Sequence, residues 1–434
     1  MKIGLYGGMA NNMYVMSKAL VDAGYDVMLV RDVDDYYPIS QPVWEDEPFL
    51  MSFHDMQATE RFTREYWIEK EKEVGWTPPS YLKVVESHVA EQSPLVGKVG
   101  RVIAHRMRRK YQGVVDLLMQ NDLLIVCGTT GELLASDLGK PYIVWPHGGD
   151  IRIAAGLVPA PVGLLARLMA FSNRRKLEHA FLKADYVGSH SPLGMGGQTV
   201  NLSSLVQRLQ FGWLPIPIAM RERAERQERI ARINDLLSAM IVNKDILPIT
   251  QDELICFIPS RVDFYWKGHD RLLRALKNVN RPVRLIFTGW GSDYEKAVDM
   301  MKGLKLDVKA EFLGAAMSKP LLYSFFDQVD LVIDQFCLGI YGTSAVEAMA
   351  SGTPVMMTID EDAWHKKGWA CPPVINVASE KDIADAFQAI IDGRIDLDAL
   401  SGETRKWFDE THSYRCFSQF VKPLFMKILA EHKP

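Results

Sequence analysis

Two basic residues near the middle of the chain have the spacing needed to bind one multiply charged anion. Arg261 follows the apolar run Leu254–Ile258, a predicted strand, and Lys267 comes six residues later, where a helix is expected to begin. A helix N-terminus adds free backbone N–H groups to the charge of the side chains. A diphosphate fits a forked guanidinium beside a compact ammonium. We therefore predict a diphosphate site; two solvated surface cations are the alternative.

A second region of interest is a glycine-containing loop that leads into a helix. Its backbone amides can cradle phosphate, and the glycine lets the backbone approach a ligand closely. The residues predicted to bind in this way are Ile340, Tyr341, Gly342, Thr343 and Ser344. Glu347 lies one turn into the helix, where a carboxylate suits the two hydroxyls of a ribose. The alternative is that Glu347 only complements the helix dipole.

These residues belong to two series of alternating strands and helices. The predicted strands are Lys2–Tyr6, Asp26–Val30, Leu123–Cys127 and Tyr142–Trp145 in the first series, and Leu254–Ile258, Arg284–Thr288, Ala310–Leu313, Leu331–Ile333 and Pro354–Met357 in the second. Apolar strands that alternate with helices predict parallel sheets covered on both faces. We therefore predict an α/β fold of two Rossmann-like, doubly wound domains, with ligands in a cleft at the carboxyl ends of the strands.

The domain borders are predicted from breaks in this pattern. Residues 1–217 form the first domain, which ends at the proline-containing segment Trp213–Pro217, and residues 218–405 form the second. Residues 45–95 are rich in aromatic and charged residues, and we expect them to be an irregular insertion on the first domain. The end of the chain, Glu403–Lys433, has the pattern of one or two amphipathic helices.

The second half of the chain resembles a known family over about a hundred residues. Residues 254–360 are similar to the donor domain of the retaining glycosyltransferases of family 4, which have the GT-B fold. The resemblance implies that Arg261 and Lys267 hold the diphosphate of a nucleotide-sugar and act in catalysis. It also implies that Glu347, as the second glutamate of an E-x7-E motif, binds the ribose.

Other positions in this region match the same family pattern. Gly289 lies in the glycine turn that the family places below the nucleotide, and Ala315 and Ala316 lie in the loop that faces the nucleobase through main-chain groups. One position departs from the pattern. Gly339 stands where the family has the first glutamate of E-x7-E, which binds the donor sugar, and Asp334 is the nearest acid. The departure leaves open which sugar is bound and whether activity is altered or lost.

The first half of the chain has two matches to the family. His147 ends the predicted strand Tyr142–Trp145 in a His-Gly turn, and the resemblance implies that it meets the donor sugar near the anomeric carbon. Gly8 follows the first strand, in the turn that the family points toward the leaving phosphates and the acceptor. The resemblance also implies that residues 406–434 form a helix that packs back on the first domain. Asp32–Asp35 imitates a metal-binding D-x-D motif, and we interpret it as a solvated turn.

Composition limits the partners and the location. The net charge of -4 gives no general attraction to nucleic acid. The five cysteines are scattered and odd in number, which is typical of a reducing compartment. We expect a cytoplasmic protein without a signal peptide or a transmembrane segment. Residues 98–110 are basic and residues 157–176 are apolar and then basic, so peripheral contact with an anionic membrane remains an alternative to ordinary solvated or buried helices.

Together these patterns predict a glycosyltransferase that uses a nucleotide-diphosphate sugar. The resemblance implies a retaining reaction, and two cations with a helix terminus would supply the positive charge without a metal or another cofactor. The acceptor is a glycan, a lipid-linked molecule or a small molecule. Two alternatives remain: a GT-B nucleotide-sugar epimerase or phosphorylase, and a catalytically inactive nucleotide-sugar-binding protein.

Overall fold

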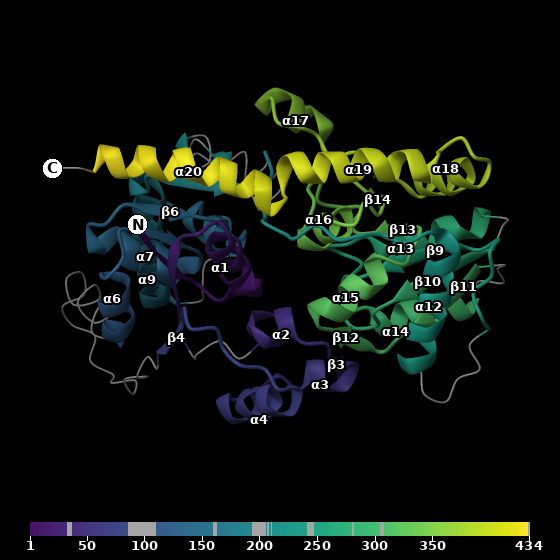
Figure 1. Cartoon of the computed structure of the whole chain (residues 1–434), viewed down its shortest axis with the longest axis horizontal. Helices are drawn as coiled ribbons and strands as arrows, with labels where there is room; N and C mark the ends of the chain where they lie inside the picture. The colour runs from purple at the N-terminus through teal and green to yellow at the C-terminus, as the bar shows by residue number, and fades with distance from the viewer. Residues whose placement is uncertain are drawn as a thin grey trace. The chain divides into compact units, whose positions relative to one another are not determined.

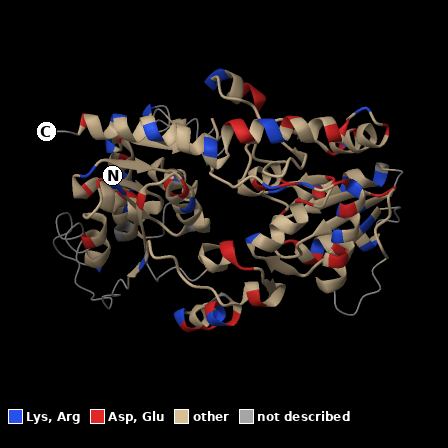
Figure 2. Ribbon diagram, in the orientation of Figure 1, with Lys and Arg blue, Asp and Glu red and all other residues tan. Residues whose placement is uncertain are grey.

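The chain forms two compact units, each built around its own parallel sheet (Figure 1). The computed structural model describes residues 1–32, 37–85, 110–158, 163–192, 205, 208–209, 211–240, 247–279, 282–303 and 308–432. Unit 1 comprises Met1–Val43, Phe62–Pro217 and Phe417–Pro434, and unit 2 comprises Trp44–Arg61 and Ile218–Cys416. The chain therefore enters unit 2 twice, for Trp44–Arg61 and for Ile218–Cys416, and returns to unit 1 each time. Acidic and basic residues are interspersed over both units (Figure 2).

Unit 1 contains a sheet of seven parallel strands. Their order across the sheet is β4 (Leu82–Val85), β2 (Asp26–Asp32), β1 (Lys2–Tyr6), β5 (Leu123–Val126), β6 (Tyr142–Val144), β7 (Tyr186–Ser189) and β8 (Gly212–Trp213). The central strands are short apolar runs, and β5 and β6 are buried throughout. Such strands are typical of a parallel sheet with both faces covered.

The helices of unit 1 include several that pack on this sheet. They are α1 (Asn12–Asp22), α4 (Arg64–Val74), α6 (Gln112–Leu118), α7 (Gly128–Leu138), α8 (Gly149–Ala154), α9 (Leu164–Lys183) and α20 (Tyr414–Glu431), with 3-10 turns η1 (Met9–Asn11) and η2 (Pro38–Ser40). Helices α6, α7 and α9 share one apolar core with the sheet. The end of the chain packs in the same unit, where the Phe425 ring meets the Tyr25 ring at 5.6 Å and His432 Nε2 lies 2.6 Å from Asp185 Oδ1.

Unit 2 contains a sheet of six parallel strands. Their order is β11 (Val308–Phe312), β10 (Val283–Phe287), β9 (Leu254–Ile258), β13 (Leu331–Ile333), β14 (Val355–Met357) and β15 (Ile375–Asn376). In both units the first strand of the series lies beside the fourth. This order is that of the doubly wound Rossmann fold, so the predicted α/β class with two Rossmann-like parallel sheets is confirmed.

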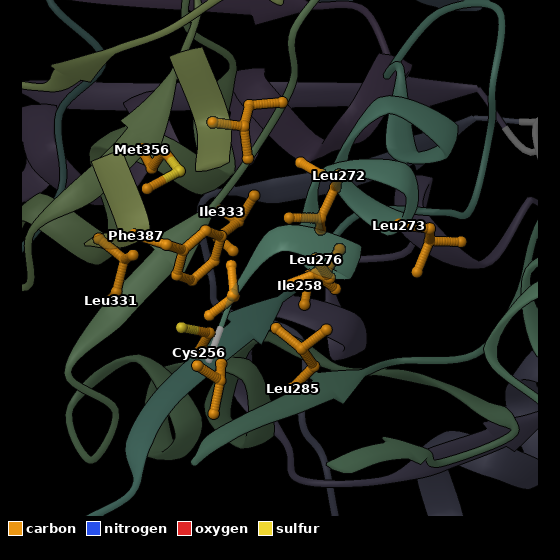
Figure 3. Close-up of a cluster of buried hydrophobic side chains, with 14 of the residues drawn as sticks. Cys256, Ile258, Leu272, Leu273, Leu276, Leu285, Leu331, Ile333, Met356 and Phe387 are labelled. Atoms are coloured by element: carbon orange, nitrogen blue, oxygen red, sulfur yellow. The ribbon is translucent and has the colours of Figure 1, made fainter. Parts of the chain in front are cut away.

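The helices of unit 2 enclose its core. They are α2 (Val43–Asp46), which begins in unit 1, α3 (Phe53–Gln57), α12 (Arg226–Met240), α13 (His269–Ala275), α14 (Tyr294–Gly303), α15 (Lys319–Phe326), α16 (Thr343–Met349), α17 (Glu361–Lys367), α18 (Glu380–Ile391) and α19 (Leu397–Thr411), with 3-10 turns η3 (Thr59–Arg61) and η5 (Leu276–Asn278). Figure 3 shows how side chains from strands and helices meet in this core, for example Ile258 and Ile333 with Leu272 and Phe387. This packing fixes where β9 and β13 end.

Two expectations about local structure are wrong. Residues 45–95 do not form one insertion on the first domain, because Trp44–Arg61 groups with unit 2. Within unit 2 the strand β3 (Leu50–Ser52) pairs antiparallel with β12 (Ala315–Met317), so Ala315 and Ala316 lie in a short strand and not in a loop. The reason is that the distant segment 50–52 supplies hydrogen-bond partners to the chain after β11.

Among the described residues, no helix is long and apolar enough to cross a membrane. Residues 98–109 and 159–162, which belong to the two stretches singled out for membrane contact, lie outside the described residues, as do residues 33–35 of the D-x-D-like segment.

Candidate active site

The first candidate site lies in unit 2, where β9 and β13 run side by side. In a doubly wound sheet, the connections of these two strands leave in opposite directions, and ligands bind in the crevice at their carboxyl ends. Arg261 and Lys267 come after β9, and Asp334 comes directly after β13. Sheet topology therefore brings together residues that are far apart in the sequence.

Lys267 is held at this point by an acid and by the backbone. Its ammonium Nζ lies 2.7 Å from Asp334 Oδ1, and its carbonyl accepts a hydrogen bond of 2.9 Å from Phe336 N–H. The Lys267 side chain is 17% exposed and that of Asp334 is fully buried. Asp334 Oδ2 makes no hydrogen bond with the described residues. It lies 3.8 Å from where a side chain on Gly342 would begin, so Lys267 and Asp334 stand beside the start of α16.

Arg261 is more exposed and pairs within its own loop. Its Nε lies 3.3 Å from Asp263 Oδ2, and its side chain is 45% exposed. Asp263 is itself fixed, because its Oδ1 accepts from Trp266 N–H at 2.8 Å. His269 completes the loop: Asp263 N–H donates to its Nδ1 at 3.2 Å. Burial and the neighbouring Lys267 lower the pKa of His269 to about 4, so its ring is neutral at pH 7.

Gly289 shapes the turn after β10. Its φ is +86°, and a Cβ at this position would lie 2.4 Å from Gly314 N. A side chain is therefore excluded on both conformational and steric grounds. Just beyond, Ala315 N–H donates to Thr288 O at 2.9 Å, which ties β12 to the end of β10.

The loop before α16 is organised by a buried side chain that the sequence did not single out. Gln335 is 1% exposed, and its Nε2 donates to Ile340 O at 2.7 Å and to Thr358 O at 3.1 Å. Its Oε1 accepts from Cys337 N–H and Leu338 N–H at 2.8 and 2.6 Å. One amide group thus satisfies four backbone groups of this region and fixes the path of the loop.

The predicted phosphate-binding residues at the start of α16 have different environments. Gly342, Thr343 and Ser344 are partly exposed, so their backbone amides can be reached. Tyr341 is fully buried, stacks on Trp364 at 5.4 Å, and has its hydroxyl 2.9 Å from His412 Nε2. The Tyr341 side chain therefore serves the core of unit 2.

Gly339, which replaces the family glutamate, has a φ of +69° and lies next to Asp360. A Cβ added to Gly339 would be 3.4 Å from Asp360 Cβ, and Asp360 N–H donates to Gly339 O at 2.9 Å. Asp360 caps α17 through Ala363 N–H. The position of the missing carboxylate is therefore bordered by another acid.

Glu347 is paired with a lysine. Lys319 Nζ lies 2.6 Å from its Oε1 and 2.8 Å from its Oε2, and the two side chains are 14% and 2% exposed. Burial lowers the pKa of Lys319, but the carboxylates of Glu347 and Glu45 raise it more, and the net pKa is above the ordinary value. Lys319 is therefore positively charged at neutral pH. Nothing in the local sequence around Lys319 indicated this partner.

In unit 1 the equivalent edge is formed by β1 and β5. Gly7 has a φ of +137°, and a Cβ on it would be 2.2 Å from Cys127 Sγ, so only glycine fits this turn. Gly8 follows, and its carbonyl accepts from Asn11 N–H at 3.3 Å. Ala10 and Asn11 both have a φ above +50°. Non-glycine residues in this left-handed region are strained, and such strain is often found at functional turns.

His147 lies at the end of β6 and contacts the start of α1. Asn12 Nδ2 donates to its Nδ1 at 2.9 Å, a contact that the sequence did not predict. Because Nδ1 is an acceptor, the proton of the neutral ring is on Nε2, which is buried and makes no hydrogen bond with the described residues. Burial lowers the pKa of His147, and Asp150 opposes this only in part.

Two buried acids lie behind His147. Asp150 accepts from His147 N–H at 3.0 Å and from Gly128 N–H at 3.3 Å, which fixes the ends of β6 and β5 together. Glu132 is fully buried, and neither of its oxygens makes a hydrogen bond with the described residues. Burial and the charge of Asp150 raise the pKa of Glu132 well above its usual range, which favours its neutral form.

The structure thus brings together Lys267, Asp334 and the start of α16 in unit 2, and His147 with Asn12 in unit 1. Arg261 forms an ion pair within its own loop, and Glu347 forms an ion pair with Lys319. Among the described residues, no group of three or more histidine, cysteine or acidic side chains is placed to hold a metal ion.

Comparisons with known proteins agree with this architecture. The Alr3699/HepE protein of Anabaena, solved in complex with UDP and glucose, superposes with a TM-score of 0.61 at 13% identity, covering 98% of this chain and 100% of that one. Sucrose-phosphate synthase from Thermosynechococcus elongatus gives a TM-score of 0.61 at 13% identity, covering 99% and 100%. The fold is that of the GT-B glycosyltransferases.

A narrower match falls on unit 2. Residues 242–407 match the family model described as Glycosyl transferases group 1. This range contains Arg261, Lys267 and Glu347 but not His147. No curated protein sequence matches the chain significantly.

Proposed function

We propose that this protein is a glycosyltransferase that binds a nucleoside-diphosphate sugar in unit 2 and transfers the sugar to an acceptor. The observation that carries the proposal is the position of Lys267 and Asp334 at the carboxyl ends of β9 and β13, beside the partly exposed start of α16. The match of residues 242–407 to group 1 glycosyl transferases supports it. So do the structural neighbours, since HepE was solved with UDP and glucose.

The cations would stabilise the departing diphosphate. The Lys267 ammonium and the backbone amides of Gly342 to Ser344 would contact the phosphates, and Arg261, half-exposed beside Asp263, would turn to the same group. Preorganised donors of this kind contribute a few kcal/mol each to a transition state in which charge develops. Positive charge from side chains and amides would suffice without a metal ion.

Two carboxylates would orient the ribose and the sugar of the donor. Each oxygen of a carboxylate can accept two hydrogen bonds, so Glu347 can keep Lys319 and also accept from ribose hydroxyls. The unpaired Oδ2 of Asp334 would accept from a hydroxyl of the sugar and so take over part of the role of the glutamate that Gly339 replaces. Gly289, Ala315 and Ala316 would provide main-chain contacts near the nucleotide.

In unit 1, His147 would act as a neutral hydrogen-bond donor. Its Nε2–H is fixed by the contact of Nδ1 with Asn12 and would donate to an oxygen atom of a bound substrate. Gly8 would allow a ligand close to the backbone of the first turn. We propose that the configuration at the anomeric carbon is retained, as the resemblance of residues 254–360 to the retaining glycosyltransferases of family 4 implies.

The test is a donor screen with the full chain. Nucleotide-sugars, beginning with UDP-glucose, are added in a thermal-shift measurement; a ligand at a hundred times its dissociation constant adds about 2.7 kcal/mol of stability. The stabilising donor is then incubated with and without glycan and lipid acceptors, and release of nucleoside diphosphate and the anomeric configuration of the product are followed by NMR. Binding of no nucleotide-sugar would contradict the proposal.

A second candidate is a binding protein that does not transfer sugar. Gly339 in place of a sugar-binding glutamate and the occupation of both Glu347 oxygens by Lys319 favour it. Stabilisation by a donor, with neither transfer nor slow hydrolysis of that donor, would select this function. An epimerase would instead convert the donor in the absence of any acceptor.

A further inference from the structure

Unit 1 contains a cavity that none of the assigned residues uses. Its volume is about 490 Å³, within the range of roughly 300–1,000 Å³ typical of small-molecule sites. The floor is formed by Val115 of α6 and by Leu134 and Leu138 of α7, all buried and apolar. Phe171 of α9 lies at the mouth and is 58% exposed. The cavity thus has an apolar interior that opens to solvent.

The cavity lies away from the His147 site. Helix α7 starts at Gly128, at the carboxyl end of β5, and the residues that line the cavity, Leu133–Leu138, form its second half. A ligand here would therefore sit near the opposite edge of the sheet from Asn12 and His147.

Helix α9, which lines the cavity, has a turn of apolar side chains that is exposed to solvent. All five residues of 167–171 are exposed, among them Leu168 (58%), Met169 (42%) and Phe171. A full helical turn with three large apolar side chains in water is costly, and contiguous exposed apolar surface marks an interaction site. The apolar turn and the cavity share Phe171.

The charge of α9 indicates which kind of partner binds there. Of its Lys, Arg, Asp and Glu residues, α9 has five basic ones (Arg167, Arg174, Arg175, Lys176 and Lys183) and one acidic one, Glu178. Arg175, Lys176 and His179 line the cavity, together with the acid Asp137. Cations around an apolar opening complement an acyl chain with an anionic head group. An anionic bilayer surface offers many such molecules and attracts each nearby Lys or Arg by about 1 kcal/mol.

We propose that α9 docks unit 1 on an anionic membrane, with one acyl chain of an anionic phospholipid inserted in the cavity beneath Phe171. Arg167, Arg175 and Lys176 contact the head groups, and Leu168 and Met169 enter the interfacial layer. This site is separate from the donor site of the proposed function. A membrane-bound unit 1 would have access to acceptors that are themselves lipid-linked.

The experiment is vesicle co-sedimentation of the full chain. Vesicles of phosphatidylglycerol with phosphatidylcholine should bind the protein, and vesicles of phosphatidylcholine alone should bind it at least about tenfold more weakly. The double variant Arg175→Glu/Lys176→Glu should lose about tenfold in affinity for the anionic vesicles. Leu133→Trp, which fills the cavity from a partly exposed position, and Phe171→Ser should each lose about as much.

Controls separate docking from general charge and from folding. Lys427→Glu and Met426→Ser alter exposed residues of α20 in the same unit and should bind like the wild type. Donor stabilisation in the thermal-shift measurement should be unchanged in the α9 variants, so failure here leaves the proposed function intact. In the variant Phe171→Trp, the fluorescence of the new indole should be quenched by phospholipids brominated in the acyl chain. Equal binding to neutral vesicles, or wild-type binding by Leu133→Trp and Phe171→Ser together, overturns the proposal.

Discussion

The carboxyl edges of the two sheets differ in the arrangement of their ionisable side chains. At the edge of unit 2, the charged groups are paired: Lys267 with Asp334, Arg261 with Asp263, and Lys319 with Glu347. At the edge of unit 1, burial lowers the pKa of His147 and raises that of Glu132, so both groups are shifted toward their neutral forms beside Asp150. Similar topology has produced one edge of ion pairs and one edge where two titratable groups are shifted toward neutrality.

The difference indicates what each edge is built to bind. Paired ions keep their charge when buried and can exchange an internal partner for a ligand of the same sign, as a diphosphate would exchange with an aspartate. Buried neutral groups that have no hydrogen-bond partner in the described part of the chain, such as Nε2 of His147 and Nε1 of Trp145, are costly until a hydrogen bond satisfies them. We therefore expect the edge of unit 2 to bind an anion strongly and the edge of unit 1 to make directional hydrogen bonds.

The largest expected effect on stability comes from breaking a pair in unit 2. Lys319→Ala leaves the buried Glu347 carboxylate without its cation, which should lower the free energy of unfolding by about 3–5 kcal/mol. Urea denaturation followed by circular dichroism measures this. The double variant Lys319→Ala/Glu347→Gln removes the stranded charge and should recover much of the loss. If Lys319→Ala costs less than about 1 kcal/mol, the pair does not organise this edge.

A smaller effect is expected at the neutral edge of unit 1. Asn12→Ala removes the donor to His147 Nδ1 and should reduce kcat by roughly tenfold with little change in KM, because the ring loses its fixed tautomer. Asn12→Asp offers an acceptor in place of a donor. It should move the ring proton to Nδ1 and raise the pKa of His147, which shifts the acidic limb of the pH–rate profile to higher pH.

The tautomer can be observed directly. In ¹⁵N NMR spectra the wild-type and Asn12→Ala chains should differ in the His147 ring shifts, and Asn12→Asp should show the opposite tautomer. Unchanged ring shifts in both variants would mean that Asn12 does not position the histidine.

The smallest expected effect is a change in the pH dependence of stability. The pKa of Glu132 is higher in the folded than in the unfolded chain, so its contribution to stability is complete below the unfolded pKa and is lost as the pH rises toward the folded pKa. Glu132→Gln cannot ionise. Between pH 5 and 8, the free energy of unfolding of this variant relative to the wild type should therefore rise. A constant difference over that range would show that Glu132 is not buried in its neutral form.

The sheets could be predicted from the sequence because each strand is a local feature. Lys2–Tyr6, Leu254–Ile258 and Leu331–Ile333 are apolar runs bounded by turn residues, and the structure gives these strands the predicted bounds. The strand β12 was missed because its partner β3 lies more than 250 residues earlier, and no local pattern encodes such a pairing. For the same reason Trp44–Arg61 was expected in the wrong unit.

The candidate site was predictable in its residue types but not in its pairings. From the predicted strand ends and helix starts, Lys267 was expected where a helix begins and Glu347 one turn inside a helix. Their partners Asp334 and Lys319 are 67 and 28 residues away, and only the order of strands brings them close. Asn12 was not predicted as a site residue, because an asparagine at the start of a helix usually caps the helix. In the structure its side chain contacts His147 instead.

The central claim is that Lys267 binds the diphosphate of the donor, and titration calorimetry with UDP tests it most directly. Asp334→Asn and Lys267→Ala/Asp334→Asn both lack the buried aspartate charge and differ only in the cation, so their stabilities should agree within about 1 kcal/mol. We expect Asp334→Asn to bind UDP and the double variant to bind it about 100-fold more weakly. Equal affinity of the two variants for UDP would contradict the account.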